Sequence, residues 1–173
     1  MHNRSNLYLI GYMACGKSTV ASRLSEIFHV RKLEMDEVIE GRAGMSISEI
    51  FEKYGEEKFR DLETDFLKDQ IRDNIIVSCG GGTPLREENR KLMKKKGIVI
   101  YLSVRPETVV QRLDVHQTGR PLLKGHVDVS YIESMMAKRD PIYRAFADCV
   151  IATDHREIDD ICRDIISFVQ GKA

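Results

Sequence analysis

The residues with the clearest chemical meaning lie near the N-terminus, where Gly11 and the run Gly16-Lys17-Ser18 are separated by four residues. This spacing makes a loop whose backbone N–H groups hold phosphate oxygens, and the following helix directs the positive end of its dipole at the same anion. The lysine reaches the β- and γ-phosphates, and the serine hydroxyl binds Mg²⁺. The pattern predicts an ATP-phosphate site at Gly11, Met13, Ala14, Cys15, Gly16, Lys17, Ser18 and Thr19.

The flanks of this loop have the required character, because the apolar run Leu7–Ile10 precedes it and a helical pattern over 17–28 follows it. A chance glycine turn rarely has both flanks correct. The loop alone does not say how the nucleotide is used. The N-K-x-D tetrapeptide typical of switch GTPases is absent from the sequence, which favours a small-molecule kinase.

A second group of chemical residues is expected at the carboxyl ends of strands, where open α/β sheets bind their ligands. Glu34 and Asp36 end one apolar run, and Gly80-Gly81-Gly82 end another. The glycines let a ligand approach the backbone closely and leave N–H groups free to donate. Each feature has an ordinary alternative: Asp36 as the N-cap of the next helix, and the glycines as a tight turn.

Three arginines complete the candidate acceptor site. Arg60 and Glu63 are one helical turn apart, so the acid can orient the guanidinium. Arg120 lies in an irregular polar stretch, and Arg139 lies towards the end of a helical pattern. Arginine offers bidentate donors that suit carboxylate or phosphate. The alternative for Arg60 is an i, i+4 pair with Glu56 on a solvated face.

The elements that must position these residues alternate between short apolar runs and longer amphipathic ones, which predicts βαβ units and a parallel sheet. Strands are expected over 7–10, 31–35, 74–78, 98–102 and 148–152. Helices are expected over 17–28, 36–43, 46–53, 56–72, 87–95, 106–113, 127–145 and 158–169, with breaks at Gly44, Gly55 and Gly97. The stretch 114–125 has little periodicity and is either a functional loop or a surface connection.

Composition limits the remaining possibilities. The 173 residues suit one domain, and 27 basic residues balance 27 acidic ones, which argues against a general nucleic-acid binder. No run is long enough to span a membrane, and the N-terminus has no signal-peptide core. The four cysteines are scattered, so we expect reduced thiols, a cytoplasmic location and, with no exposed apolar stripe evident, a monomer.

Taken together, the motifs resemble those of the shikimate kinase family, within the nucleoside-monophosphate-kinase-like P-loop enzymes. They appear in order: the P-loop, the acidic pair, Phe59-Arg60-x-x-Glu63, the glycine triplet, Arg120-Pro121-Leu122-Leu123 and Arg139-x-Pro141-x-Tyr143. The resemblance implies a three-layer αβα fold with a five-stranded parallel sheet of order 2-3-1-4-5. It also implies a single domain over 1–173, a mobile lid over about 114–125 and a shikimate-binding region over about 34–63.

The same resemblance implies a role for each site residue. Asp36 would bind the shikimate hydroxyls and orient or deprotonate the attacking one, while Arg60, Arg139 and the backbone of Gly80, Gly81 and Gly82 would hold the substrate. Lys17 and Arg120 would act on the transferring phosphate, and Ser18 with Glu34, through water, would bind Mg²⁺. Arg112 and Arg156 would lie near the adenine of ATP, and Ile47 and Phe59 would form the apolar wall.

Two positions depart from the family pattern. Glu34 stands where the family usually has aspartate, and Ala14 stands where it commonly has glycine, which narrows the allowed backbone conformations. Two alternatives stay open: a kinase of the same superfamily for another small molecule, such as gluconate or a nucleoside monophosphate, and a catalytically idle binding module, which these two departures alone support. Retention of Lys17, Ser18 and Asp36 argues against the idle module.

Overall fold

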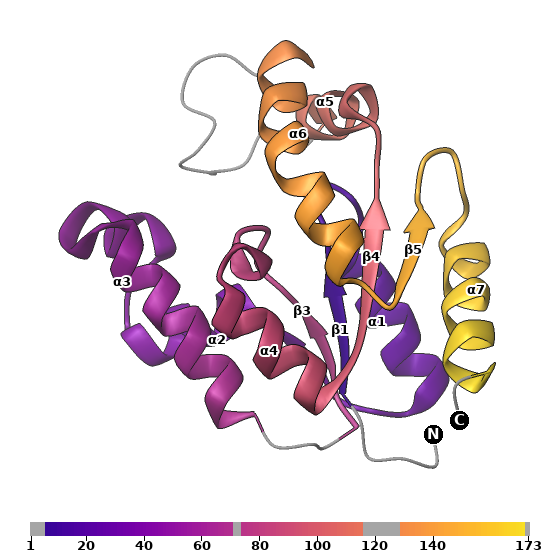
Figure 1. Cartoon of the computed structure of the whole chain (residues 1–173), viewed down its shortest axis with the longest axis horizontal. Helices are drawn as coiled ribbons and strands as arrows, with labels where there is room; N and C mark the ends of the chain where they lie inside the picture. Colours follow the sequence, from indigo (N-terminus) through magenta and orange to yellow (C-terminus); the bar gives the residue numbers. More distant parts are fainter. Residues whose placement is uncertain (1–5, 71–73, 116–128, 172–173) are drawn as a thin grey trace.

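The computed structural model describes residues 6–70, 74–115 and 129–171 as a parallel sheet with helices on both faces (Figure 1). The strands are β1 (Asn6–Ile10), β2 (Lys32–Glu34), β3 (Ile76–Ser78), β4 (Gly97–Ser103) and β5 (Cys149–Ala152). Their order is β2-β3-β1-β4-β5, and all four pairings are parallel. This confirms the predicted sheet, and it brings all carboxyl ends to one edge.

The helices join these strands as crossovers. They are α1 (Lys17–Phe28), α2 (Met35–Ala43), α3 (Ile47–Asp69), the 3₁₀ turn η1 (Thr83–Leu85), α4 (Glu87–Lys96), α5 (Pro106–Val115), α6 (Val129–Phe146) and α7 (Ile158–Gly171). In Figure 1, α5 and the start of α6 lie beyond the carboxyl ends of the strands, above the tip of β4.

Two apolar layers follow from the alternation of side chains along the strands. Leu7 and Leu9 of β1 face a cluster that includes α1 and α7, whereas Tyr8 and Ile10 face a second cluster that includes α2, α3 and α4. The side chains of α6 contribute to both clusters, with Ile132 in the first and others near its C-terminal end in the second. The sheet is therefore buried on both faces, as an all-parallel sheet requires.

The predicted boundaries differ from the structure in a few places. The expected helices over 46–53 and 56–72 correspond to the two helical parts of α3, which meet at a kink at Gly55, where φ is 81° and ψ is 170°. The predicted break at Gly55 is therefore confirmed. Strand β3 begins at Ile76 rather than at Asn74, whose φ of 53° is outside the extended region. The predicted lid over 114–125, apart from the last two residues of α5, lies outside the described residues.

Two expectations about the environment can be compared with the structure. No helix among the described residues is long and apolar enough to cross a membrane. The four cysteines are free thiols, and Cys15, Cys79 and Cys162 are buried.

Candidate active site

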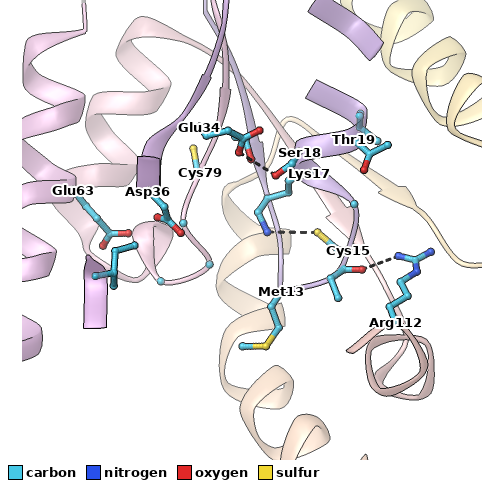
Figure 2. Close-up of a pocket in the computed structure, with 18 of the residues that line it drawn as sticks. Met13, Cys15, Lys17, Ser18, Thr19, Glu34, Asp36, Glu63, Cys79 and Arg112 are labelled. Carbon is cyan, nitrogen blue, oxygen red and sulfur yellow. Dashed lines mark hydrogen bonds between the residues drawn. The ribbon is translucent and has the colours of Figure 1, made fainter. Parts of the chain in front are cut away.

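A cavity of about 720 Å³ lies at the carboxyl edge of the sheet and joins the phosphate loop to the predicted acceptor side chains. Figure 2 shows Lys17 between the carboxylates of Asp36 and Glu63 on one side and Arg112 on the other. Ligand sites of open α/β sheets lie at this edge. The cavity therefore has a nucleotide half and an acceptor half, with the P-loop lysine between them.

The phosphate loop connects β1 to α1 and directs its lysine inwards. Lys17 Nζ donates to the carbonyl oxygens of Gly11 and Tyr12, at 3.0 Å each, and lies 3.7 Å from Cys15 Sγ. The ammonium group is thus held against the backbone of the loop that is predicted to bind the phosphate oxygens. Gly11 itself is buried and does not line the cavity, although the rest of the predicted loop does.

Ala14 adopts a left-handed backbone conformation, with a φ of 57°. The expected restriction at this position is therefore real, because a Cβ atom in this region clashes with the following carbonyl. The carbonyl of Ala14 accepts a 2.8 Å hydrogen bond from Arg112 Nη1, and Arg112 Nη2 donates to the carbonyl of Thr153 at 3.0 Å. Arg112 therefore ties the phosphate loop to the residue that follows β5.

Two oxygen-bearing side chains meet at the start of α1. Ser18 Oγ donates to Glu34 Oε2 at 3.0 Å, and both residues line the cavity (Figure 2). The longer glutamate side chain still reaches the serine. Among the described residues, no group of three acidic, histidine or cysteine side chains is arranged to hold a metal by itself. Mg²⁺ takes one or two protein oxygens together with waters and substrate phosphates as ligands, and the Ser18 hydroxyl and the Glu34 carboxylate are oxygens of this kind.

The acceptor half is built around an arginine held by two acids of α3. Arg60 donates to Glu56 Oε1 and to Glu63 Oε2, each at 2.8 Å. The alternative interpretation of Arg60 was a pair with Glu56 on a solvent-exposed helix face. The pair is present, but the predicted exposure was wrong, because Arg60 is only 8% exposed. Burial raises the pKa of Glu63, while Arg60 and the Thr83 hydroxyl, at 2.5 Å, lower it.

Asp36 lies on the same cavity, as the second residue of α2. The alternative that Asp36 serves only as an N-cap is wrong, because Glu34 occupies the N-cap position. Asp36 is exposed on the cavity surface, and its charge contributes to the raised pKa of Glu63. A carboxylate therefore faces the space between the phosphate loop and Arg60.

Close approach of neighbouring side chains requires glycine at two positions of the triplet, Gly80 and Gly82. A Cβ at Gly80 would lie 2.7 Å from Glu63 Oε1 and 3.1 Å from Asp36 Oδ1, and one at Gly82 would lie 2.5 Å from Arg60 Cζ. The triplet also makes the tight turn that was the alternative, since the backbone N–H of Thr83 donates to the carbonyl of Gly80 at 3.1 Å. The missing side chains make room for the acids and the arginine.

Arg139 reaches the same turn from α6. Its guanidinium charge lowers the pKa of the nearby Tyr143 hydroxyl, and this hydroxyl donates to the carbonyl of Gly81. Burial raises the pKa of Tyr143 to about 12, so this hydroxyl keeps its proton. The Arg139 guanidinium also lies 5.5 Å from the centre of the Tyr12 ring, within cation–π range.

An apolar wall closes the acceptor half. Ile47, Phe51 and Phe59 of α3 line the cavity, and the two phenylalanine rings are 5.1 Å apart. A capping box at Ser46 starts the helix that carries them, with Ser46 N donating to a Glu49 carboxylate oxygen at 2.7 Å. Phe51 was missed from the sequence, although its spacing of four from Ile47 places it on the same helical face.

The structure brings together every other predicted site residue that it describes. Arg156 also lines the cavity, at the nucleotide end, whereas Arg120 lies outside the described residues. Sequence reasoning missed Glu40, Ser48 and Thr153, which line the cavity too. The position of Thr153 directly after β5 was an available signal, since strand ends mark such sites.

Comparisons with known proteins agree with this geometry. The family model described as shikimate kinase matches residues 13–170. A shikimate kinase from Dictyoglomus turgidum is 38% identical over 167 residues, covering 94% of this chain and 96% of the relative. One from Rhodopirellula baltica is 39% identical over 165 residues, covering 93% and 88%. The chain belongs to the shikimate kinase family.

A solved structure supports the same assignment. The shikimate kinase from Acinetobacter baumannii, in complex with shikimate, superposes with a TM-score of 0.89 at 33% identity, over 97% of this chain and 94% of that one. The Glu34 and Ala14 departures therefore occur within the family. They leave the phosphate loop and the acid–arginine cluster on one cavity.

Proposed function

We infer that the protein is a shikimate kinase, which transfers the γ-phosphoryl group of ATP to the 3-hydroxyl of shikimate. One observation supports this most directly: a single cavity joins a P-loop to a buried arginine held by acids. A polyhydroxy carboxylate matches the acceptor half of the cavity, because arginine pairs with a carboxylate and an aspartate accepts hydrogen bonds from hydroxyls. A nucleotide acceptor would instead need side chains that read a base.

We propose that Asp36 accepts the hydrogen bond of the attacking hydroxyl and that Arg60 and Arg139 bind the substrate carboxylate. Asp36 comes from α2, Arg60 from α3 and Arg139 from α6, and all three line the cavity. Phosphoryl transfer asks little covalent chemistry of the protein, so positioning and charge stabilisation provide the catalysis. The buried Glu63 keeps Arg60 in place for this purpose.

Charge stabilisation falls to the nucleotide half. Lys17 is already held at the centre of the cavity, from where it can move from the loop carbonyls to phosphate oxygens. Arg120 is proposed to assist it from the lid. Arg112 and Arg156 are proposed to shape the adenine end, which is supported by their hydrogen bonds to the carbonyls of Thr153 and Ala152.

We propose that Mg²⁺ binds next to Ser18 and, through water, to Glu34. The adjacency of these two oxygens at 3.0 Å supports this site. When bound, the ion neutralises charge on the phosphates and helps to align them. The protein's contribution is to hold the serine hydroxyl and the carboxylate side by side at the start of α1.

We further propose that the enzyme acts in the cytoplasm as a monomer. The four free thiols support a reducing compartment. The exposed large apolar side chains of the described residues are on five separate elements and so make no extended patch: Ile27, Tyr54, Leu85, Tyr131 and Val150.

A coupled assay of ADP release tests the function, with shikimate, gluconate and AMP offered as acceptors. Of the three acceptors, only shikimate is expected to support ADP release. No ADP release at millimolar shikimate would overturn the proposal. Arg60→Ala should raise KM for shikimate, and Asp36→Asn should lower kcat by about 100-fold or more, the usual contribution of a positioned acid or base. Undiminished turnover of both variants would overturn the site assignment alone.

A further inference from the structure

Four side chains of β2 and α1 form a closed ring beside the proposed metal position. Ser18 Oγ donates to Glu34 Oε2 at 3.0 Å, and Lys32 Nζ lies 3.1 Å from Glu34 Oε1. Lys32 Nζ also donates to Ser22 Oγ at 3.0 Å, and Ser22 Oγ donates to the carbonyl of Ser18 at 2.9 Å. The ring therefore places a fixed positive charge on the carboxylate that would serve the metal.

Local geometry explains why Lys32 and Glu34 meet. They are two residues apart on β2, so their side chains project from the same face of the sheet, towards α1. Serines 18 and 22 are four residues apart and lie on one face of α1. Since β2 is an edge strand, the lysine stem can lie along the sheet edge while its ammonium group reaches both partners.

The ion pair between Lys32 and Glu34 is shielded enough from solvent to affect the binding of a metal ion at Glu34. The side chain of Glu34 is 13% exposed and that of Lys32 is 30% exposed, whereas the ion pairs on the outer faces of the helices involve acids that are mostly more than half exposed. Partly buried charges are screened less by water and salt. The P-loop lysine does not substitute for Lys32, because Lys17 Nζ donates to the carbonyls of Gly11 and Tyr12.

We propose that Lys32 is a resident cation that shares the Glu34 carboxylate with Mg²⁺ and so weakens metal binding. The inference rests on the proposed metal site. Lys32 Nζ lies beside one oxygen of Glu34 as an ion pair that lacks hydrogen-bond geometry, and the other oxygen accepts from Ser18. Removal of the ammonium group leaves the full carboxylate charge for the ion and removes a repulsive charge near it. Lys32 is a residue that sets metal affinity, without contact to the reacting atoms.

The expected effect is large enough to measure. A unit charge several ångströms from a divalent ion, in partly solvated surroundings, changes the affinity by about tenfold after screening. Lys32→Met keeps the length of the side chain and removes its charge. We therefore expect the complex with ADP to bind Mg²⁺ about tenfold more tightly in Lys32→Met than in the wild type.

Isothermal titration calorimetry with ADP at a series of Mg²⁺ concentrations gives this affinity by linkage, without shikimate or turnover. An arm with EDTA measures the change in ADP affinity that is independent of metal. Lys32→Gln is a second neutral variant and should behave like Lys32→Met. Lys32→Arg keeps the charge, and Ser22→Ala removes only the second partner of the lysine, so both should stay within about threefold of wild type.

Thermal unfolding separates a metal-tuning role from a merely structural one. Without metal, Lys32→Met should unfold at a lower temperature than wild type, because Glu34 loses its cation, and saturating Mg²⁺ with ADP should reduce the deficit. Unchanged or weaker Mg²⁺ binding in both neutral variants would overturn the proposal, as would an equal deficit with and without metal. If ADP binding to the wild type ignores Mg²⁺, both this inference and the metal site fail, whereas shikimate-dependent ADP release would still test the kinase assignment.

Discussion

The buried hydrogen bond between Thr83 and Glu63 offers a sharp test of how the acceptor half is held. Glu63 is 0% exposed, and its two carboxylate oxygens accept from Thr83 at 2.5 Å and from Arg60 at 2.8 Å. Thr83→Val keeps the shape of the side chain and removes the hydroxyl. Leaving a buried, charged acceptor without its donor costs about 3 kcal/mol. For a domain of this size, that lowers the melting temperature by roughly 6–12 °C.

The pH dependence of this loss follows from the pKa of Glu63, which burial raises and which Arg60 and Thr83 lower. Loss of the Thr83 donor raises the pKa further. A carboxyl whose pKa is higher in the folded state than in the unfolded state contributes its stability at low pH and loses it as pH rises through the folded value. The stability deficit of Thr83→Val should therefore be smaller at pH 5 than at pH 8.

The same variant should affect substrate binding through Arg60. With Glu63 less firmly ionised, the guanidinium loses part of its orientation, and KM for shikimate should rise about five- to tenfold while KM for ATP changes little. Thr83→Ser keeps the hydroxyl and should restore both stability and KM. Thr153→Val removes a buried hydroxyl at the nucleotide end and should leave the shikimate KM unchanged.

Thermal unfolding at pH 5 and pH 8, together with steady-state kinetics, measures these quantities. The reasoning is refuted if Thr83→Val melts like the wild type, or if its deficit is larger at pH 5 than at pH 8.

Further predictions concern the loop, the thiols and α6. Ala14→Gly should raise the melting temperature by roughly 2 °C, since relief of about 1–2 kcal/mol of left-handed strain exceeds the added chain entropy of about 0.4–1 kcal/mol; a lower melting temperature in a thermal scan would contradict this. In the native protein, Cys149 should react with a thiol reagent before the three buried cysteines, as mass spectrometry of the labelled peptides would show. Tyr143→Phe removes the hydroxyl between Arg139 and the carbonyl of Gly81 and should raise KM for shikimate about fivefold; an unchanged KM would show that the bridge does not orient Arg139.

Much of the fold was predictable because its signals are local. The short apolar runs and the amphipathic helical pattern between them predicted five strands and their crossovers, and the helix over 17–28 has the predicted bounds. Strand order came from the family resemblance, since periodicity says nothing about which strands pair. The break at Gly55 was also predicted from the sequence, and the structure has a kink with non-helical φ and ψ there.

The candidate site also has one part that the sequence predicted and another that only the structure revealed. Motif spacing identified Lys17, Ser18 and Arg60, because their chemistry depends on short-range geometry. It did not identify Thr83, whose partner Glu63 is 20 residues away, nor show that the solvated alternative for Arg60 was wrong. Burial decides both, and burial depends on how α3 packs against the turn after β3.

The sequence by itself determined that this protein holds phosphate and that acids and arginines follow its strands, because those properties belong to residue types at fixed spacing. Only the tertiary structure decided that Gly80 and Gly82 make room for Glu63 and Arg60, and that Lys32 rests on Glu34 beside Ser18. Except for the ion pair within β2, these contacts join residues of different elements, so they exist only once the packing of helices and strands brings those elements together.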